Sequence, residues 1–332
     1  MRIESAIRKK PFIIAEIGNN HEGDLGLAKE MVAAAAESGA DAVKFQAINP
    51  EALVNGLLRP DRLERLRELC LDFDGFATLS EQARGLGVFF GASIFDLDSC
   101  DRFDYFDFYK VASSDFNYQQ LIKKIAEKDK PLVLSSGMSS AIEINNVVEI
   151  VGSRSAPTVI CHCVSLYPAP LDTLNLGALS EIGRLIKGRA ILGYSDHSDD
   201  LTANIVAASL GATVFEKHFT LSKTHSEFRD HSLASTPDEL VAYRAELEKA
   251  FIARGKGNLE ERDVAELDVA KEARRAVFLK RDLKKGDVVA LNDLLALRPA
   301  LGIKCEEMDA LVGKVALVDI SRLQELSWSN FD

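Results

Sequence analysis

The stretch AILGYSDHSDDLTANIVAASLGATVFEKHFT, residues 190–220, decides the fold of this chain. It contains two apolar runs, 190–196 and 214–220, separated by the helical pattern LTANIVAASLG. Near-continuous apolar runs joined by one helix are typical of parallel strands that are covered on both faces. The stretch therefore predicts a strand, a helix and a second strand parallel to the first.

Each of these two strands brings a histidine to its carboxyl end: His197 follows Asp196, and His218 lies in FEKHFT. Because neighbouring parallel strands end at the same edge of a sheet, we expect both imidazoles at one rim. Two imidazoles there can hold a divalent metal ion and leave coordination positions open for a substrate. The alternative is that each histidine is an ordinary core or surface residue.

Six further apolar runs precede this stretch, and a helical pattern follows each of them: PFIIAEIG, DAVKFQA, VFFGASIF, FDFYKVASS, PLVLSSG and TVICHCV. Eight strand–helix units within about 250 residues predict an α/β fold of the (β/α)8, or TIM-barrel, type. A doubly wound open sheet is the alternative, but no glycine-rich dinucleotide fingerprint follows the first run. Ser140 with Glu143, and Thr236 with Glu239, predict the starts of two helices.

The composition predicts three regions. Residues 1–252 are expected to form the barrel, and residues 253–272 are charged and poor in large apolar side chains, as in a linker that is helical in part. Residues 273–332 predict a small β-rich domain that is too small for a catalytic cleft of its own.

Polar side chains gather at or just after the predicted strand ends: Glu16, Asn20, His21, Lys44, Gln46, Ser93, Lys110, Ser113, Asp115, Ser135, Ser165, Tyr167, Ser195, Asp196, His197, Glu216 and His218. In a barrel these ends form the rim where active sites lie, although strand ends are also wetter than strand centres in general. A lysine inside an apolar strand, such as Lys44 or Lys110, is costly to bury without an anionic partner. We favour a bound phosphate or carboxylate as that partner over internal ion pairs.

The remaining histidines are weaker candidates. In Cys161-His162-Cys163 neighbouring side chains alternate between the two faces of a strand, so three ligands cannot converge and buried packing is favoured. His21 is expected either at the barrel mouth or as a cap of the first helix. A polar loop after the last strand brings Asp230 over the mouth, with His231 a better candidate for ligand contact than His225.

Charge and cysteine content limit the class of protein. The 332 residues carry a formal net charge of -11, which argues against a nucleic-acid-binding surface. Five cysteines, an odd number, in a long chain that lacks a signal peptide predict reduced thiols and a cytoplasmic location. No apolar run approaches the length that crosses a membrane, so no membrane partner is expected.

The chain resembles the N-acetylneuraminate (sialic acid) synthase family along nearly its whole length. The motifs that carry the resemblance are AEIGNNHEGDLGLAKEMVAAAAESGADAVKFQ, YKVASSD, LVLSSGMS, LGYSDHS and FEKHFT. The C-terminal domain, with RPALGI, resembles the family's antifreeze-like (SAF) domain. The family joins phosphoenolpyruvate to an open-chain N-acetylated aldose and releases phosphate, giving a nine-carbon 2-keto acid. The resemblance therefore implies an enzyme, a transferase that forms a carbon–carbon bond.

The resemblance also implies roles for individual residues. His197 and His218 would hold a divalent metal, commonly manganese, while the ligand types leave magnesium, cobalt and zinc open. The implied phosphoenolpyruvate ligands are Lys44, Ser93, Lys110, Ser113, Ser135 and Ser195. The implied sugar contacts are Glu16, Gln46, Tyr167, Asp230 and Arg298, the last from the other subunit of a domain-swapped homodimer. Glu16 is the first candidate for acid–base work and Asp230 the second.

The sequence departs from the family pattern mainly where the sugar would bind. Phe228-Arg229 replaces a proline-glycine pair, Asp115 replaces a glutamate, Ser165 replaces an asparagine, and the segment 49–71 is short. We therefore expect an aldose other than N-acetylmannosamine, with diacetamido 6-deoxyhexoses as candidates. Two other functions stay open: a non-catalytic sugar-phosphate-binding protein, and a different metal-dependent barrel lyase or hydrolase.

Overall fold

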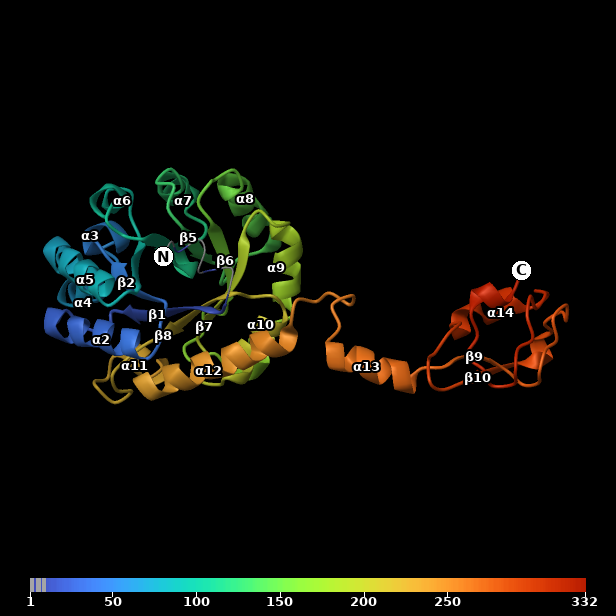
Figure 1. The fold of residues 1–332 in the computed structure, drawn as a ribbon. Coiled ribbons are helices and arrows are strands. Elements are labelled where there is room, and N and C mark those ends of the chain that lie inside the picture. The colour runs from blue at the N-terminus through green and yellow to red at the C-terminus, as the bar shows by residue number, and fades with distance from the viewer. Residues whose placement is uncertain (1–2, 4–6, 8–9) are drawn as a thin grey trace. The chain divides into compact units, whose positions relative to one another are not determined.

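The computed structural model describes residues 3, 7 and 10–332. Eight strands close into a barrel in which every neighbouring pair is parallel (Figure 1). They are β1 (Phe12–Gly18), β2 (Ala42–Ala47), β3 (Phe89–Ile94), β4 (Phe108–Val111), β5 (Leu132–Ser135), β6 (Thr158–Cys163), β7 (Ile191–Asp196) and β8 (Val214–His218). Each strand lies within one of the predicted apolar runs. The predicted TIM barrel is confirmed, and the open sheet is excluded.

Helices follow the strands and surround the barrel (Figure 1). They are α2 (Leu25–Glu37), α3 (Pro50–Leu53), α4 (Pro60–Leu69), α5 (Phe73–Gly85), α6 (Ser99–Arg102), α7 (Gln119–Ala126), α8 (Ala141–Val151), α9 (Ala178–Ile186), α10 (Thr202–Ser209), α11 (Arg229–Leu233) and α12 (Pro237–Arg254). The two predicted helix starts are confirmed. The Ser140 N–H donates to the Glu143 carboxylate at 2.8 Å, and the Thr236 N–H donates to the Glu239 carboxylate at 3.0 Å.

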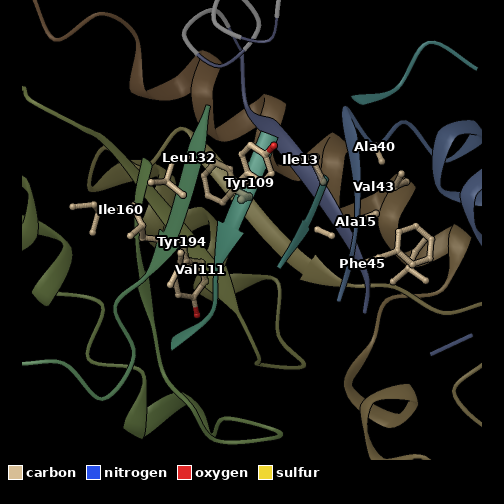
Figure 2. Close-up of a cluster of buried hydrophobic side chains, with 14 of the residues drawn as sticks. Ile13, Ala15, Ala40, Val43, Phe45, Tyr109, Val111, Leu132, Ile160 and Tyr194 are labelled. Atoms are coloured by element: carbon tan, nitrogen blue, oxygen red, sulfur yellow. The ribbon is translucent and has the colours of Figure 1, made fainter. Parts of the chain in front are cut away.

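Alternate residues along each strand face the helices, and the residues between them face the barrel axis. The helix-facing residues, such as Val43, Tyr109 and Ile160, form a large apolar core (Figure 2). The axis-facing residues near the amino ends of the strands form a separate apolar cluster: Ile14, Ala42, Phe108, Val133, Val159 and Val214. Toward the carboxyl ends the axis-facing positions become charged or hydroxylated. One end of the barrel interior is therefore apolar and the other is polar.

The strand register brings three of these polar residues to the same level of the barrel. Glu16 on β1 lies opposite Lys44 on β2 and opposite His218 on β8. Gly18 ends β1 with a φ of +58°, and a Cβ there would lie 2.9 Å from the Glu16 carboxylate. Glycine thus allows both the backbone turn and the position of that carboxylate.

The C-terminal unit, Lys256–Asp332, has its own apolar core, which includes Val277, Leu311 and Leu326. Strands β9 (Ala276–Leu279) and β10 (Leu294–Leu297) pair antiparallel, and helices α13 (Val264–Ala273) and α14 (Met308–Leu311) flank them in the chain. Among the described residues, the other strand-like pairings of this unit are isolated bridges. The unit is thus less regular than the β-rich domain predicted, and α13 occupies the second half of the expected linker.

Within the described part of the chain, no helix is both long enough and apolar enough to cross a bilayer. The five cysteines are free thiols.

Candidate active site

A cavity of about 270 Å³ opens at the carboxyl ends of the barrel strands. Most of the site residues predicted from the sequence line it: Glu16, Lys44, Gln46, Ser93, Lys110, Ser113, Ser135, Tyr167, Ser195, His197, His218 and Asp230. The barrel therefore brings together residues that are up to about two hundred positions apart in the chain, as their places at the ends of the strands predicted.

Two lysines and two glutamates form the floor of this cavity. The Lys44 ammonium pairs with the Glu16 carboxylate and lies 3.9 Å from that of Glu216. The Lys110 ammonium lies 3.7 Å from Glu216, and both lysine side chains are only 3% exposed. Internal carboxylates thus accompany both lysines, whereas the sequence favoured a bound anion as their partner. Because these carboxylates balance the lysine charges, the burial of the lysines does not by itself require a bound anion. Anion binding by Lys44 and Lys110 stays a prediction.

Glu216 was expected at the barrel mouth from its place near the end of the last strand, but without a specific role. It lies two residues before His218, so both side chains face the barrel axis. The Ser195 hydroxyl donates to the Glu216 carboxylate at 2.8 Å. Glu216 therefore connects a serine of β7 to the two lysines. The cavity is also lined by residues that were not selected as site candidates: Asn19, Arg62, Cys163 and Arg229.

Glu16 is the group in the cavity best suited to exchange a proton near neutral pH. Burial raises the pKa of its carboxyl to about 7, an effect that the Lys44 ammonium opposes and the Glu216 charge reinforces. The Gln46 amide donates to the Glu16 carboxylate at 3.3 Å and fixes its orientation. A carboxyl with a pKa close to the working pH is an effective general acid or base.

The rings of His197 and His218 face each other across the strand ends, with centroids 5.4 Å apart. Two imidazoles that bind one ion have centroids no more than about 6.4 Å apart, because each metal–nitrogen bond is about 2 Å long. His197 Nδ1 lies 2.7 Å from the Val164 carbonyl and therefore carries a proton. In the neutral form of this ring, Nε2 keeps its lone pair and can bind a metal ion. The imidazole pair is therefore close enough to share a metal ion.

His218 is suited to be a ligand because it is neutral and lacks a partner. Its buried Nδ1 has no hydrogen-bond partner among the described residues. Burial lowers the pKa of His218 well below its ordinary value, and the nearby His197 and Lys44 lower it further. Within the described ranges, no group of three or more His, Cys, Asp and Glu side chains is arranged to hold a metal. An ion held by this imidazole pair would keep its other positions for water and substrate.

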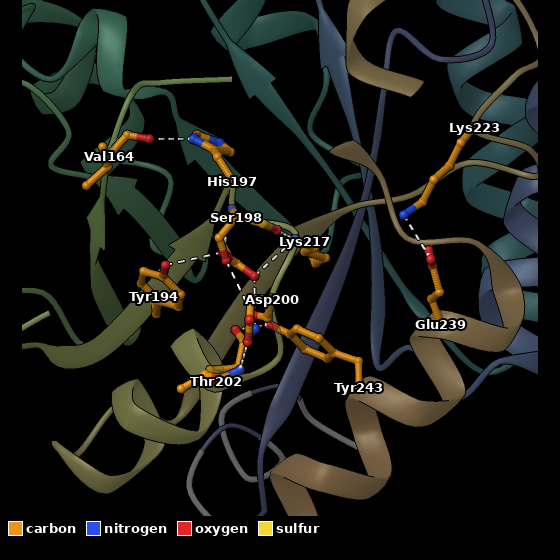
Figure 3. Close-up of polar contacts among 12 residues, drawn as sticks. Val164, Tyr194, His197, Ser198, Asp200, Thr202, Lys217, Lys223, Glu239 and Tyr243 are labelled. Carbon is orange, nitrogen blue, oxygen red and sulfur yellow. Dashed lines mark hydrogen bonds and ion pairs between the residues drawn. The ribbon is translucent and has the colours of Figure 1, made fainter. Parts of the chain in front are cut away.

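A buried polar network on the outer side of β7 and β8 supports both histidines (Figure 3). The Asp196 carboxylate accepts hydrogen bonds from the Ser198 N–H at 2.8 Å and from the Lys217 ammonium at 3.0 Å. The Lys217 ammonium also donates to the Ser198 carbonyl. Because these bonds join the residues on both sides of His197 to the residue before His218, they fix the two strand ends relative to each other.

Helices α10 and α12 complete this network. The Asn204 amide of α10 donates to the Asp196 carboxylate at 2.9 Å, and the Tyr243 hydroxyl of α12 donates to Asn204 at 2.6 Å. We refer to Asp196, Ser198, Asn204, Lys217 and Tyr243 as the strand-end network. None of these five residues lines the cavity, so the network supports the site from outside it.

Two serines carry buried hydroxyls that could bind a ligand. The hydroxyls of Ser135 and Ser165 have no hydrogen-bond partner within the described residues. Ser165 does not line the cavity, but a Cβ on Gly137 would lie 2.5 Å from its hydroxyl and 2.7 Å from that of Ser113. Because Gly137 has no side chain, the hydroxyls of Ser113 and Ser165, which follow β4 and β6, can approach this turn after β5. Unpaired buried hydroxyls are rare unless a ligand or water binds them.

Some predicted residues lie elsewhere. Asp115 ends a short 3-10 turn, Ser113–Asp115, and accepts a hydrogen bond from Ser114 rather than lining the cavity. Arg298 is exposed after β10 in the C-terminal unit, and its contact with a sugar stays a prediction. His21 is buried outside the cavity and accepts the Gly23 N–H at 3.1 Å, so it is not a residue of the cavity wall. His231 is likewise outside, 3.0 Å from Glu22.

A TIM barrel whose mouth combines buried lysines, hydroxyls and an imidazole pair has the layout of a barrel enzyme. The chain belongs to the NeuB family, whose model matches residues 31–259, and a SAF domain follows at residues 274–332. It is an enzyme of the sialic-acid-type synthases, the group to which its named relatives belong.

Two relatives and one solved structure illustrate the similarity. The N,N'-diacetyllegionaminic acid synthase of Legionella pneumophila is 34% identical over 97% of this chain and 94% of its own length. The human N-acetylneuraminate-9-phosphate synthase is 33% identical over 93% of this chain and 89% of its own length. The N-acetylneuraminic acid synthetase of Leptospira borgpetersenii, solved with citrate, has a TM-score of 0.74 and 31% identity, and the match covers 79% of this chain and 90% of that one.

Proposed function

We propose that this enzyme condenses phosphoenolpyruvate with an N-acetylated aldose and releases phosphate, forming a nine-carbon 2-keto sugar acid. The observation that carries the proposal is the cavity itself: buried ammonium groups, serine hydroxyls and an imidazole pair line one cavity within a chain of the NeuB family. The names of the relatives support a product of the sialic, legionaminic or pseudaminic acid type.

Phosphoenolpyruvate is proposed to bind at the floor of the cavity. Its phosphate and carboxylate would accept hydrogen bonds from the Lys44 and Lys110 ammonium groups. Hydrogen bonds between charged groups of opposite sign are stronger than those between neutral groups. The hydroxyls of the surrounding serines would donate to the remaining oxygens: Ser93, Ser113, Ser135 and Ser195. The Ser195 hydroxyl would turn from the Glu216 carboxylate to do so. Because these donors lie on separate strand ends of one rigid barrel, they are held in place before the substrate binds.

The aldose is proposed to bind above, with its aldehyde between this floor and the imidazole pair. His197 and His218 would hold a divalent ion, manganese in our proposal, which supplies positive charge where the aldehyde oxygen becomes negative. Gln46, Tyr167 and Asp230 would position the sugar. The third carbon of phosphoenolpyruvate attacks the aldehyde carbon, water adds at the second carbon, and phosphate then leaves.

Glu16 is proposed to move the proton in this sequence. Its carboxyl, with a pKa of about 7, lies opposite His218 in the strand register and next to the Lys44 ammonium. In its ionised form it would accept a proton from the attacking water, and in its protonated form it would donate one to the alkoxide oxygen. Asp230 stays the second candidate for this role.

We further propose that the protein is a homodimer in which Arg298 of one subunit contacts the sugar bound in the other. The support is the resemblance of RPALGI to the family's SAF motif and the SAF model match over residues 274–332. A cytoplasmic location is proposed because the five cysteines are free thiols.

The test measures phosphate release from phosphoenolpyruvate with N-acetylmannosamine, diacetamido 6-deoxyhexoses and other N-acetylated aldoses. We expect release that chelation abolishes and manganese restores, and that His218→Ala reduces by at least about a thousandfold. His225→Ala is the matched control, because His225 is exposed and outside the cavity. Binding of phosphoenolpyruvate without phosphate release from any aldose would contradict the synthase function and favour the non-catalytic alternative.

A further inference from the structure

Two guanidinium groups, those of Arg62 and Arg229, line the cavity and have no role in the function proposed above. The side chain of Arg229 is 66% exposed, whereas those of Lys44 and Lys110 are each 3% exposed. The lysines therefore lie at the floor and Arg229 lies near the opening. This outer part of the cavity is where the end of the sugar farthest from its aldehyde would lie.

Arg229 is held in place by its neighbours. Its guanidinium carbon lies 4.5 Å from the centroid of the Tyr167 ring, and that ring lies 4.1 Å from the His197 ring. Its Nε donates to the Asp230 carboxylate at 3.2 Å, while its terminal nitrogens have no hydrogen-bond acceptor among the described residues. A fixed guanidinium with free terminal N–H groups is suited to bidentate binding of a phosphate or carboxylate.

Arg62 lies on α4, the helix that packs next to Arg229. Arg65, one turn further along this helix, places its guanidinium 5.5 Å from the Phe228 ring, and Phe228 directly precedes Arg229. Residues three apart on a helix share one face, so Arg62 and Arg65 point toward the same loop. Within the described part of the chain, Arg62 forms no ion pair. The cavity mouth therefore contains a second guanidinium that no carboxylate neutralises.

Charge balance separates the floor of the cavity from its mouth. At the floor, two lysines face two glutamates, so their formal charges cancel. Among the described residues that line the mouth, two arginines face one carboxylate, that of Asp230. A neutral sugar would leave one positive charge of this outer region without a partner. An anionic group at that end of the sugar would pair with it.

We infer that the aldose carries an anionic group, a phosphate ester or a carboxylate, on the carbon farthest from its aldehyde, and that Arg62 and Arg229 bind this group. The inference rests on the proposed function and narrows its substrate. It also gives a role to Arg229, which replaces the small residue of the family pattern. A 6-deoxyhexose has no such group and is expected to be a poorer substrate.

The experiment measures phosphoenolpyruvate consumption by the full chain with manganese and matched aldoses. The panel holds N-acetylmannosamine and N-acetylglucosamine, their 6-phosphates and their 6-carboxylates. We expect kcat/KM to be at least about tenfold higher for one anionic form than for its neutral parent. Preference for the phosphate or the carboxylate identifies which anion the site accepts. Added salt should reduce this preference, because the guanidinium groups are near solvent.

Single substitutions test the two arginines. Arg62→Gln should lower kcat/KM for the anionic aldose by about tenfold and change it for the neutral parent by less than about twofold. Arg229 also contacts Tyr167 and Asp230, so Arg229→Gln should lower kcat/KM for both aldoses, but about tenfold more for the anionic one. Arg59→Gln is the control, because Arg59 directly precedes α4 but does not line the cavity. Equal use of neutral and anionic aldoses, or an equal loss for both in the arginine variants, would overturn the inference and leave the synthase function standing. If no aldose leads to phosphoenolpyruvate consumption, the proposed function and this inference both fail.

Discussion

At the residue scale, Glu16 makes the folded barrel sensitive to pH. In the folded protein its carboxyl keeps a proton up to about pH 7, whereas its ordinary pKa is 4.5. Between these values the folded state binds more protons than the unfolded state, so the free energy of unfolding falls as the pH rises. The contribution of Glu16 to stability is thus favourable at low pH and is lost as the pH passes 7.

Glu16→Gln, which cannot ionise, should therefore help the ligand-free protein more at pH 8 than at pH 5. We expect its effect on the free energy of unfolding to differ by about 1–3 kcal/mol between the two pH values. Urea unfolding followed by circular dichroism measures this difference. Glu216→Gln is the comparison that should show little difference between pH 5 and pH 8. Burial acts to raise the pKa of Glu216, but Lys110 and Lys44 hold it below its ordinary value, so Glu216 is ionised in both states at these pH values. An identical effect of Glu16→Gln at both pH values would show that Glu16 is ionised throughout.

Most of the residues that the sequence predicted correctly for the cavity share one property: they occupy axis-facing positions of a barrel strand. Lys44, Ser195 and His218 are of this kind. Arg62 could not be found in this way, because it lies on a helix after β2 and its direction depends on how α4 packs against the loop before α11. Asp115 was misplaced for the same reason, since a turn after β4 directs its carboxylate to Ser114.

At the element scale, the strand-end network controls how the two histidines are presented. Asp196→Asn removes the charge that Lys217 pairs with and places an amide among several donors. We expect the manganese affinity of the protein to fall by about ten- to a hundredfold, as for other groups that orient metal ligands. Breaking this buried ion pair should also lower the free energy of unfolding by about 3 kcal/mol. Calorimetric titration with manganese and urea unfolding measure the two effects.

Two other variants separate positioning from general destabilisation. Glu239→Gln breaks the Lys223–Glu239 ion pair, 2.8 Å long, on the same side of the barrel (Figure 3). Both side chains are more than a third exposed, so we expect less than about 1 kcal/mol and an unchanged manganese affinity. Tyr243→Phe removes one hydrogen bond of the network and should weaken manganese binding less than Asp196→Asn does. If Asp196→Asn binds manganese within twofold of wild type, Asp196 does not position the two histidines.

Helix α8 offers a stability test that should leave the site unaffected. Ser140 begins the helix: its hydroxyl accepts the Glu143 N–H at 3.3 Å, and its own N–H donates to the Glu143 carboxylate. Ser140→Ala should lower the free energy of unfolding by about 1 kcal/mol, and Ser140→Asp should recover most of it. Thermal unfolding measures the change, and phosphate release should stay within twofold of wild type. A loss of activity in Ser140→Ala would show that α8 is coupled to the cavity.

The elements of the barrel were predictable because each strand is buried on both sides and is therefore a continuous apolar run. The elements of the C-terminal unit were not predictable, because its core is assembled largely from turns and isolated bridges. Leu311, Ile320 and Leu326 are fully or almost fully buried there, yet none of them lies in a regular strand. Without a period of two or 3.6 residues, the sequence indicated a small domain but not its elements.

At the scale of the whole molecule, the question is whether one copy of the chain contains a complete site. The barrel provides every group proposed to bind phosphoenolpyruvate, whereas Arg298 belongs to the unit that begins at Lys256. If Arg298 acts on the sugar bound by a second copy, an isolated copy is incomplete. A mixture of two inactive variants can then restore activity.

Co-expression of Arg298→Ala with His218→Ala tests this arrangement. In a mixed dimer, the intact barrel of the first variant would receive the intact Arg298 of the second, which gives one complete site for every two subunits. Random pairing makes about half of the dimers mixed, so we expect about a quarter of wild-type phosphate release, compared with nearly none for either variant alone. The control pairs His197→Ala with His218→Ala, which damages both barrels and should restore nothing. If the first mixture is as inactive as this control, Arg298 does not act between subunits. In that case each barrel uses the Arg298 of its own chain, and a partner subunit cannot replace it.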